Sequence, residues 1–547
     1  MRALVEHLRP RSPASLMSTD VNVEKPFYRP EDISGLDYAA DLNDPGTYPY
    51  TRGRLTRPRR DAGSWILREL SGEGSPAQSN RQFRDLIARG ALGLDVIGDA
   101  PTVGCLDPDH PFARAAVGTQ GVSICRYQDF VELYEGIPLD RLTLSHSMPS
   151  WFALAGLHLL ARDHEVAPSV LRGSVIQTPL YAEDYCYAIH MPVELRMRLT
   201  LDSIEFCTRE MPRFHSFVED TYFVSDGGPS AVDEMALGFV EIRKVVRELT
   251  ARGVAIDSFA PRIAILVNCR MGFFEEIAKI RASRRIFARM MRDEFGARDP
   301  RSWSANITAH TAGSALTAQQ PVNNVVRGAV QALALALAGV QAMEISTFDE
   351  AYRTPSPQAH MLALRTQQII GLETDCGKVA DPLGGSYYVE NLTNQMDRQI
   401  TDRVREIEGA GDAIELSNRG YFRRLLEEAM IARAAEIQNG TVAKVGVNVC
   451  QVPDEDDTML RDLAETKIEP CLDHIERIRE FKRTRDQDRV RGALTALRSC
   501  ADDRGESLMD PLIAALQADG TIGEIAGAMR MAYGMPYDPL SGIPAPF

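Results

Sequence analysis

Short strand-like runs alternate with longer amphipathic runs along most of this chain, from about residue 90 onward. Eight runs favour strands, namely Gly93–Asp99, Arg141–Ser147, Gly173–Thr178, His215–Tyr222, Ile263–Cys269, Ser304–Thr311, Ala342–Thr347 and Lys378–Ala380. Helical runs between them include Trp151–Ala161, Ala231–Ala251, Phe273–Glu294 and Thr317–Ala338. Eight strands that alternate with helices predict an α/β protein with a (β/α)8 TIM barrel. A doubly wound sheet is the competing fold, but no Gly-x-Gly-x-x-Gly follows the first strand.

Three of these runs alternate apolar with small polar residues: Leu142–His146, Ser304–His310 and Glu344–Thr347. The interior of such a barrel is usually filled by Val, Ile and Leu. Because alternate strand residues face opposite sides, the apolar set suits the helices and the polar set would face the axis. This pattern predicts a polar channel that could hold an extended polar ligand. The alternative is a set of misphased strands with polar residues near their ends.

The two ends of the chain differ from the barrel region. Residues 1–47 are rich in Pro, Asp and Arg and predict an extended N-terminal arm, followed by the barrel over residues 48–450. Residues 451–547 predict a linker and a C-terminal helical segment, with helical runs at Leu472–Ala501 and Met509–Ala532. This segment is too short for another α/β domain, so we expect a helical cap or docking segment.

Charge and cysteine content restrict the partners and the compartment. A net charge of −15 over 547 residues argues against a general nucleic-acid binder or a binder of anionic membranes, so an anionic ligand would need a local basic site. The nine scattered cysteines contain no Cys-x-x-Cys pair, which predicts reduced thiols in a cytoplasmic protein, without a zinc site or disulfide frame. No apolar run of about 18 residues predicts a membrane span, and no apolar signal segment predicts secretion.

The segment Asp381–Thr393 reads Asp-Pro-Leu-Gly-Gly-Ser-Tyr-Tyr-Val-Glu-Asn-Leu-Thr. It resembles a signature of the methylmalonyl-CoA mutase family, whose members use adenosylcobalamin to rearrange the carbon skeletons of acyl-CoA thioesters. Further matches follow in order within residues 45–535, namely Tyr48–Gly53, Gly136–Asp140, Phe259–Arg262, Leu316–Gln319, Asn323–Arg327 and Phe348–Ala351. The resemblance implies a barrel-bearing isomerase that binds an acyl-CoA.

The cobalamin-binding module of this family normally follows the barrel and carries Asp-x-His-x-x-Gly, whose His ligates cobalt. No such string occurs in this sequence, and the nearest, Asp473-His474, lacks the spacing. The resemblance therefore implies a hetero-oligomer in which a separate small subunit holds most of the adenosylcobalamin, as in the isobutyryl-CoA and 2-hydroxyisobutyryl-CoA mutases. It leaves open a G-protein chaperone that would load the cofactor.

Basic residues before and within the barrel are candidates for binding the phosphates of coenzyme A. The candidates are Arg57, Arg59, Arg60 and Arg262. Arginine offers bidentate donors to phosphate, and the family grips these phosphates with an arm and a strand start at the N-terminal mouth of the barrel. For residues 57–60 the alternative is a set of loose surface arginines.

Further candidates follow the carboxyl ends of strands, where barrel enzymes place their chemistry. The resemblance implies that Gln177 contacts the substrate, that Tyr222 lies near the reacting carbons and the adenosyl group, and that Glu350 contacts the adenosyl ribose. For each residue the alternative is a helix cap or a core hydrogen bond.

Three more residues belong to this set. His310 and Ser346 stand where the family has Gln and Asn contacts, and Asp226 is a further candidate for the side that faces the cofactor. His310 is either a polar substitute for the glutamine or a barrel histidine whose hydrogen bonds are satisfied internally.

The substrate pocket departs from the family pattern at three positions. Phe223 stands where the family has a histidine that donates to the thioester carbonyl, and phenylalanine cannot donate a hydrogen bond. Tyr187 replaces the arginine that holds the free carboxylate of methylmalonyl-CoA, so that carboxylate would be poorly compensated. Leu70 replaces the tyrosine that wedges against the substrate. These changes argue against methylmalonyl-CoA as the substrate.

Gln177, Tyr222, Glu350 and Arg262 together favour a working ligand site. We therefore hypothesise an adenosylcobalamin-dependent acyl-CoA mutase large subunit that acts on a monocarboxylic acyl-CoA. A noncatalytic partner subunit of a heteromeric mutase is the alternative, favoured by Phe223 and Leu70. A barrel enzyme that uses coenzyme A without cobalamin is a third hypothesis.

Overall fold

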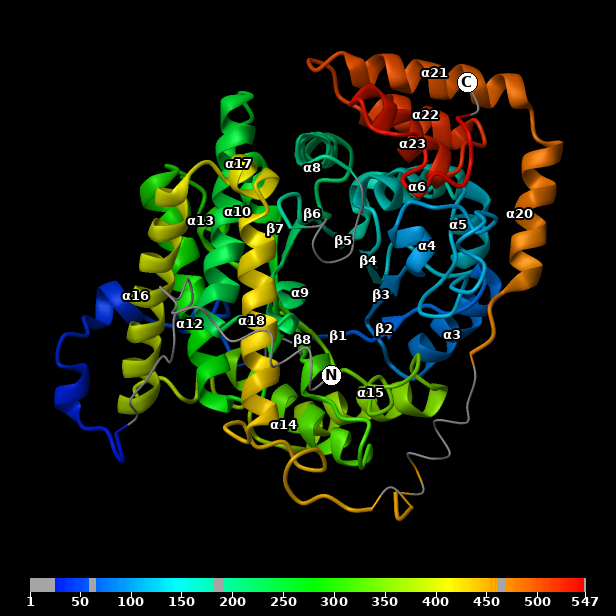
Figure 1. Ribbon diagram of the computed structural model, residues 1–547. Coiled ribbons are helices and arrows are strands. Elements are labelled where there is room, and N and C mark those ends of the chain that lie inside the picture. The colour runs from blue at the N-terminus through cyan, green and yellow to red at the C-terminus, as the bar shows by residue number, and fades with distance from the viewer. Residues whose placement is uncertain are drawn as a thin grey trace.

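The computed structural model describes residues 25–58, 65–181, 191–453, 455–457, 459 and 468–545. Nine parallel strands form one sheet in the order β1-β9-β8-β7-β6-β5-β4-β3-β2 (Figure 1). The strands are β1 (Ile66–Leu67), β2 (Leu70–Ser71), β3 (Gly93–Ile97), β4 (Thr143–Ser147), β5 (Arg172–Ile176), β6 (His215–Asp220), β7 (Ile263–Cys269), β8 (Asn306–Thr311) and β9 (Ala342–Glu344). Because β1 pairs with β9 and β2 pairs with β3, the broken strand over residues 66–71 joins the two ends of the sheet and closes the TIM-type barrel.

Seven of the eight expected strands are confirmed, whereas the strand expected at Lys378–Ala380 is wrong. Those residues form bends in the loop between two helices, just before Asp381 with its positive φ of 47° and Pro382, which has no N–H to donate to a sheet. The eighth position of the barrel belongs instead to residues 66–71. Its two paired pieces have only two residues each and are separated by Arg68 and Glu69, so the segment carries little strand signal.

Helices follow the strands, and most of them surround the sheet on its outer side. They are α3 (Pro76–Ala88), α4 (Ala100–Val103), α5 (Tyr127–Leu133), α6 (Ser150–Asp163), α8 (Val193–Glu210), α9 (Thr221–Asp226), α10 (Ala231–Ala251), α11 (Ile256–Phe259), α12 (Phe273–Arg289), α13 (Pro300–Trp303), α14 (Asn323–Ala338), α15 (Pro357–Glu373), α16 (Tyr387–Ala410), α17 (Ala413–Asn418), α18 (Tyr421–Gln438), α20 (Leu472–Thr484), α21 (Gln487–Asp502), α22 (Met509–Gln517) and α23 (Ile522–Ala532). The short 3-10 helices are η1 (Pro30–Ile33), η3 (Pro168–Val170), η4 (Ala260–Arg262) and η6 (Gly313–Ala315), and the π-helices are η2 (Tyr38–Leu42) and η5 (Met290–Glu294). No helix in these described ranges is long and apolar enough to cross a bilayer.

The helical predictions hold with local changes. The run Ala231–Ala251 is a single helix with those bounds, while the run from Thr317 becomes helical only at Asn323. The run Leu472–Ala501 is two helices, because Asp486 accepts from the backbone of Asp488 and Arg489 and starts a new one.

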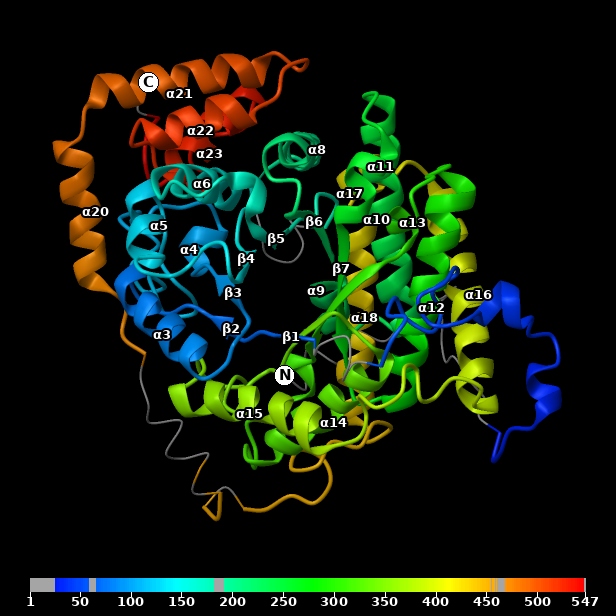
Figure 2. The same ribbon diagram turned by 180° about the vertical axis from the view of Figure 1, so that it is seen from behind.

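Two large apolar clusters form the core between the sheet and the helices around it. One joins the outer faces of β6 to β9 to α10, α12, α14 and α16, and the other joins β3 to β5 to α3, α5, α6 and α8. The second cluster also contains apolar side chains of α20 to α23, so the C-terminal helices extend the barrel core. Figures 1 and 2 show these helices over the side of the barrel formed by α5 and α6.

The segment Asp381–Thr393 has a structural role outside the barrel. Asp381 pairs with Arg52 (Nε to Oδ2 2.9 Å) and with Arg281, while Arg281 also pairs with Glu390 (Nη2 to Oε1 2.6 Å). The N–H of Gly385 donates to the same Glu390 oxygen at 2.9 Å. The segment thus holds the residues that precede β1 against α12 and the start of α16.

The barrel wall is only partly polar. Thr143, Ser174, Asn306 and Thr308 line one internal cavity, which confirms that the small polar residues face the axis there. A separate apolar cluster contains Ile176, Val218, Ala264 and Leu266, and its Val218 and Ala264 line the same cavity. The channel is therefore polar along one part of its wall and apolar along β5 to β7.

Candidate functional site

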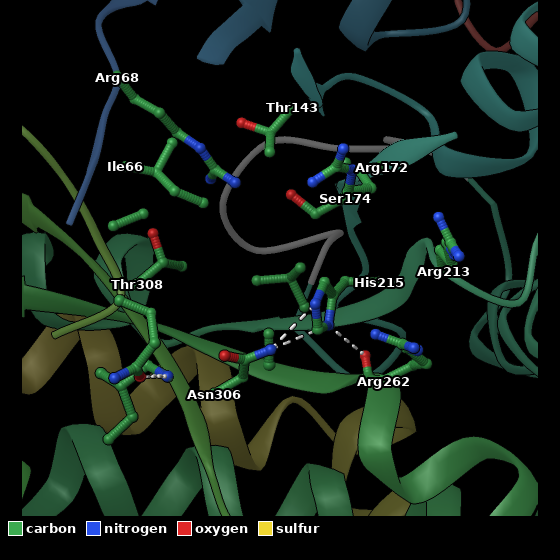
Figure 3. Close-up of a pocket in the computed structure, with 16 residues that line it drawn as sticks. Ile66, Arg68, Thr143, Arg172, Ser174, Arg213, His215, Arg262, Asn306 and Thr308 are labelled. Carbon is green, nitrogen blue, oxygen red and sulfur yellow. Dashed lines mark hydrogen bonds between the residues drawn. The ribbon is translucent and has the colours of Figure 1, made fainter. Parts of the chain in front are cut away.

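A cavity of about 460 Å³ opens at the N-terminal ends of the barrel strands. Four arginines line it, namely Arg68, Arg172, Arg213 and Arg262, and Figure 3 shows them around one opening. In a chain with a net charge of −15, this is a concentrated cationic site. Guanidinium groups bind phosphate oxygens in pairs of hydrogen bonds, so the site suits a phosphorylated ligand.

The backbone of Arg262 is held in place by a half-buried histidine. Nδ1 of His215 lies 3.0 Å from the carbonyl oxygen of Arg262, and its Nε2 lies 2.9 Å from Nδ2 of Asn306 (Figure 3). A carbonyl only accepts, so Nδ1 donates and Nε2 accepts from the Asn306 amide. Burial and the neighbouring Arg262 lower the pKa of His215 to about 3. His215 is therefore neutral near pH 7 and adds no charge to the site.

The other predicted phosphate ligands lie elsewhere. Arg57 is exposed in the loop before β1 and does not line the cavity, and Arg59 and Arg60 lie outside the described residues. Arg54 from the same loop bonds instead to Oδ1 of Asn306 at the cavity wall. Sequence reasoning missed Arg54, Arg68, Arg172 and Arg213, although the positions of Arg172 and Arg213 just before two predicted strands were available as a signal.

Several predicted residues meet at the opposite, C-terminal end of the barrel. The ring centroids of Tyr222 and His310 are 4.7 Å apart, and Oγ of Ser346 lies 3.2 Å from Nδ1 of His310. A Cβ atom on Gly313 would lie 3.1 Å from the Tyr222 hydroxyl, 3.3 Å from Oδ2 of Asp226 and 3.9 Å from Oγ of Ser346. Tyr222, Asp226 and Ser346 thus bring three polar atoms to one point that the missing side chain of Gly313 leaves open.

Glu350 and Gln177 carry internal hydrogen bonds. Oε2 of Glu350 accepts from the N–H of Thr347 at 2.9 Å, and burial raises the pKa of Glu350 above its usual range. Gln177 accepts from Ser150 Oγ at 2.9 Å and donates to the carbonyl oxygen of Ser216. The contact of Gln177 with a substrate stays a prediction, because both ends of its amide have partners within the protein.

Two of the three substrate-pocket candidates lie within the described residues. Phe223 is half-buried, lies 5.5 Å from the ring of Tyr222 and packs against the apolar cluster of β5 to β7. Leu70 is half-buried in β2, opposite Asp95 of β3. Tyr187 lies outside the described residues.

Comparisons with known proteins agree with this architecture. The family model described as methylmalonyl-CoA mutase matches residues 18–535. The 2-hydroxyisobutanoyl-CoA mutase large subunit of Aquincola tertiaricarbonis is 33% identical over 500 residues, which cover 90% of this chain and 88% of that protein. Methylmalonyl-CoA mutase of Rhizobium meliloti is 33% identical over 517 residues, covering 93% and 71%, and the human mitochondrial enzyme is 32% identical over 518 residues, covering 93% and 67%.

Proposed function

Because this chain belongs to the methylmalonyl-CoA mutase family, an isomerase family, we propose that it is the large subunit of an adenosylcobalamin-dependent acyl-CoA mutase. Its substrate would be a monocarboxylic acyl-CoA rather than methylmalonyl-CoA, and a small subunit would hold most of the cobalamin. The observation that carries this proposal is the arginine-lined cavity at the N-terminal mouth, on the same axis as Tyr222 and His310.

In this proposal the phosphates of coenzyme A bind to Arg262, Arg213 and Arg172. The cavity extends along the wall to Val218, Thr308 and Ala342, which leads the pantetheine arm inward from the mouth. The thioester then lies near Tyr222. Arg262 would contribute most to phosphate binding, since His215 fixes its backbone and its side chain faces an already cationic wall.

The residues at the C-terminal end fit an adenosyl group. The open space beside Gly313 places a phenol, a carboxylate and a hydroxyl around one point, and these groups match the donors and acceptors of ribose hydroxyls. Glu350, Ser346 and Asp226 would hold the ribose. When bound, the cofactor supplies the radical chemistry of the rearrangement, and the protein supplies orientation and exclusion of water.

The acidic surroundings of the acyl end favour a substrate with no second carboxylate. Asp220, at the end of β6, accepts from the N–H of Phe223, and burial raises its pKa to about 8. Phe223 itself packs against apolar side chains. A free carboxylate placed there would lose its hydration without gaining a cation from these neighbours.

The test combines the chain with a small cobalamin-binding subunit and follows the isomerisation of isobutyryl-CoA, 2-hydroxyisobutyryl-CoA and methylmalonyl-CoA. We expect turnover of a monocarboxylic ester. The value of kcat/KM for methylmalonyl-CoA should be lower by about a hundredfold, because its free carboxylate would have no cation to pair with. Arg262→Leu should weaken acyl-CoA binding by about tenfold, and Arg57→Leu, the exposed control, should not. Absence of both turnover and acyl-CoA binding would overturn the proposal.

Phe223 and Leu70 also support a second candidate, a noncatalytic subunit that stabilises a competent mutase chain. This candidate predicts no turnover with the small subunit and a gain of activity or stability when a full-length mutase is added.

A further inference from the structure

Asn268 lies near the C-terminal end of β7 and has none of its surface exposed. Strand alternation places it on the same inward side as Ala264 and Leu266. Its side-chain amide donates to Oδ1 of Asp226 and to Oγ of Ser225, at 3.1 Å each. Asp226 is one of the three residues around the open space beside Gly313. A fully buried Asn268 would therefore act on a ligand in that space through Asp226.

The backbone of Asn268 is held by a buried ion pair. Oε1 of Glu234 accepts from its N–H at 3.1 Å, and Nζ of Lys279 donates to its carbonyl oxygen at 2.7 Å. Lys279 also pairs with Glu234 at 2.8 Å and with Glu276 at 2.5 Å, and the side chains of all three residues have no exposed surface. These contacts fix the peptide groups on both sides of the Asn268 side chain, so its amide stays directed at Asp226.

The two oxygens of the Asp226 carboxyl have different surroundings. Oδ1 accepts from the Asn268 amide and from Oγ of Ser314 at 2.6 Å. Oδ2 accepts from the N–H of Ser314 at 3.2 Å and lies 3.3 Å from the point that a Cβ atom on Gly313 would occupy. All of these partners donate, which suits an ionised carboxyl. Asn268 thus occupies Oδ1 and leaves Oδ2 to a donor in the open space.

We propose that Asn268 is a positioning residue that directs Oδ2 of Asp226 at the open space beside Gly313, where this oxygen accepts from a ligand hydroxyl. The inference rests on the proposed function, in which the hydroxyl belongs to the ribose of the adenosyl group. Tyr222, Glu350 and Lys444 also interact electrostatically with Asp226. They stay in place in the variants below, so a new pH dependence would come from residues 226 and 268.

The test measures the binding of adenosine and of 2′,3′-dideoxyadenosine, which lacks both of these ribose hydroxyls, to the full chain by calorimetry between pH 5.5 and pH 9. The wild-type chain should bind adenosine about tenfold more tightly at every pH, as expected for a hydrogen bond to a charged group. Asn268→Asp places a second carboxyl at the 3.1 Å contact with Asp226. Two carboxyls this close share a proton at low pH and repel each other when both ionise.

The preference of Asn268→Asp for adenosine should therefore persist at pH 5.5, where the new carboxyl can donate as the amide did. It should fall to about one at pH 9, where repulsion turns Asp226 away from the open space. The double variant Asp226→Asn, Asn268→Asp exchanges the amide and the carboxyl across the contact. It should bind both nucleosides about equally at every pH, because one carboxyl remains and it no longer faces the ligand.

Asn80→Asp is the matched control. Asn80 of α3 is 7% exposed, and its amide also donates two hydrogen bonds, to the carbonyl oxygens of Leu133 and Glu135. This variant should keep the wild-type preference at every pH.

Three outcomes would overturn the inference. An Asn268→Asp chain with the wild-type preference at every pH would show that Asn268 does not direct Asp226, and an equal loss at pH 5.5 and pH 9 would assign Asn268 a purely structural role. Equal binding of both nucleosides to the wild-type chain would show that no hydroxyl is recognised. In these cases only this inference fails; if the wild-type chain binds neither nucleoside, the adenosyl site of the proposed function fails with it.

Discussion

Single ionisable residues inside this protein are held in one protonation state by burial. His146 of β4 is 1% exposed, and the hydroxyl of Tyr134 donates to its Nε2 at 2.6 Å. Burial lowers the pKa of His146 to about 3. The pKa of His215 at the cavity is also lowered to about 3, because neighbouring arginines add to the effect of burial. Both rings remain neutral in the folded protein at pH values where an unfolded histidine takes up a proton.

This difference makes His146 a source of acid sensitivity. Because its folded pKa is depressed, the unfolded chain binds more protons between about pH 6.5 and pH 3, so its stabilising contribution is lost as the pH falls. Between pH 7 and pH 5 the loss should be about 2 kcal/mol. His146→Gln should make the unfolding free energy less dependent on pH by this amount, as measured by urea denaturation at both pH values.

The exposed His164 provides the control, since His164→Gln should leave the pH dependence unchanged. An unchanged pH dependence in the His146 variant would contradict the argument.

At the scale of elements, alternation of strands and helices was enough to predict the barrel and seven of its strands. The closing strand could not be predicted, since its pairing comes from the tertiary ring and its four paired residues flank Arg68 and Glu69. The candidate site, too, could be predicted only in part. Family motifs indicated Arg262 and the group around Tyr222, whereas the place of Arg68 at the cavity depends on which strands become neighbours across the closure.

The ion pairs of the Asp381–Thr393 segment should contribute strongly to stability. Arg281 is 1% exposed on its side chain and pairs with both Asp381 and Glu390, so Arg281→Met would leave two buried carboxylates short of a partner. We expect a loss of about 3 kcal/mol, measured as a lower midpoint of chemical denaturation. Arg405→Met removes a pair whose side chains are 73% and 72% exposed and should cost less than about 1 kcal/mol. Equal effects of the two variants would show that the segment does not depend on this pairing.

Across the whole molecule, the two ends of the barrel carry different polar side chains, and the C-terminal helices pack beside the barrel. The arginine cavity lies at one end, the Tyr222 group lies at the other, and α20 to α23 share a core with β3 to β5. Helix α8 also forms hydrogen bonds with the C-terminal helical segment. Arg198 is 6% exposed, and its guanidinium donates to the carbonyl oxygens of Cys500, Ala501, Asp503 and Glu506 at 2.6–3.1 Å.

Arg198→Met should therefore loosen the connection between α21 and α22 while the barrel stays folded. The four carbonyls would lose a charged donor, and hydrogen bonds to charged groups contribute enough to change local opening by at least about tenfold. Trypsin should then cleave after Arg498 or Arg504 about ten times faster, as followed by mass spectrometry, with circular dichroism of the intact chain little changed. Arg209→Met changes an exposed arginine of the same helix and should leave the cleavage rate unaltered. If both variants are cleaved at the wild-type rate, the apolar core alone holds the C-terminal helices, and the Arg198 contacts contribute little.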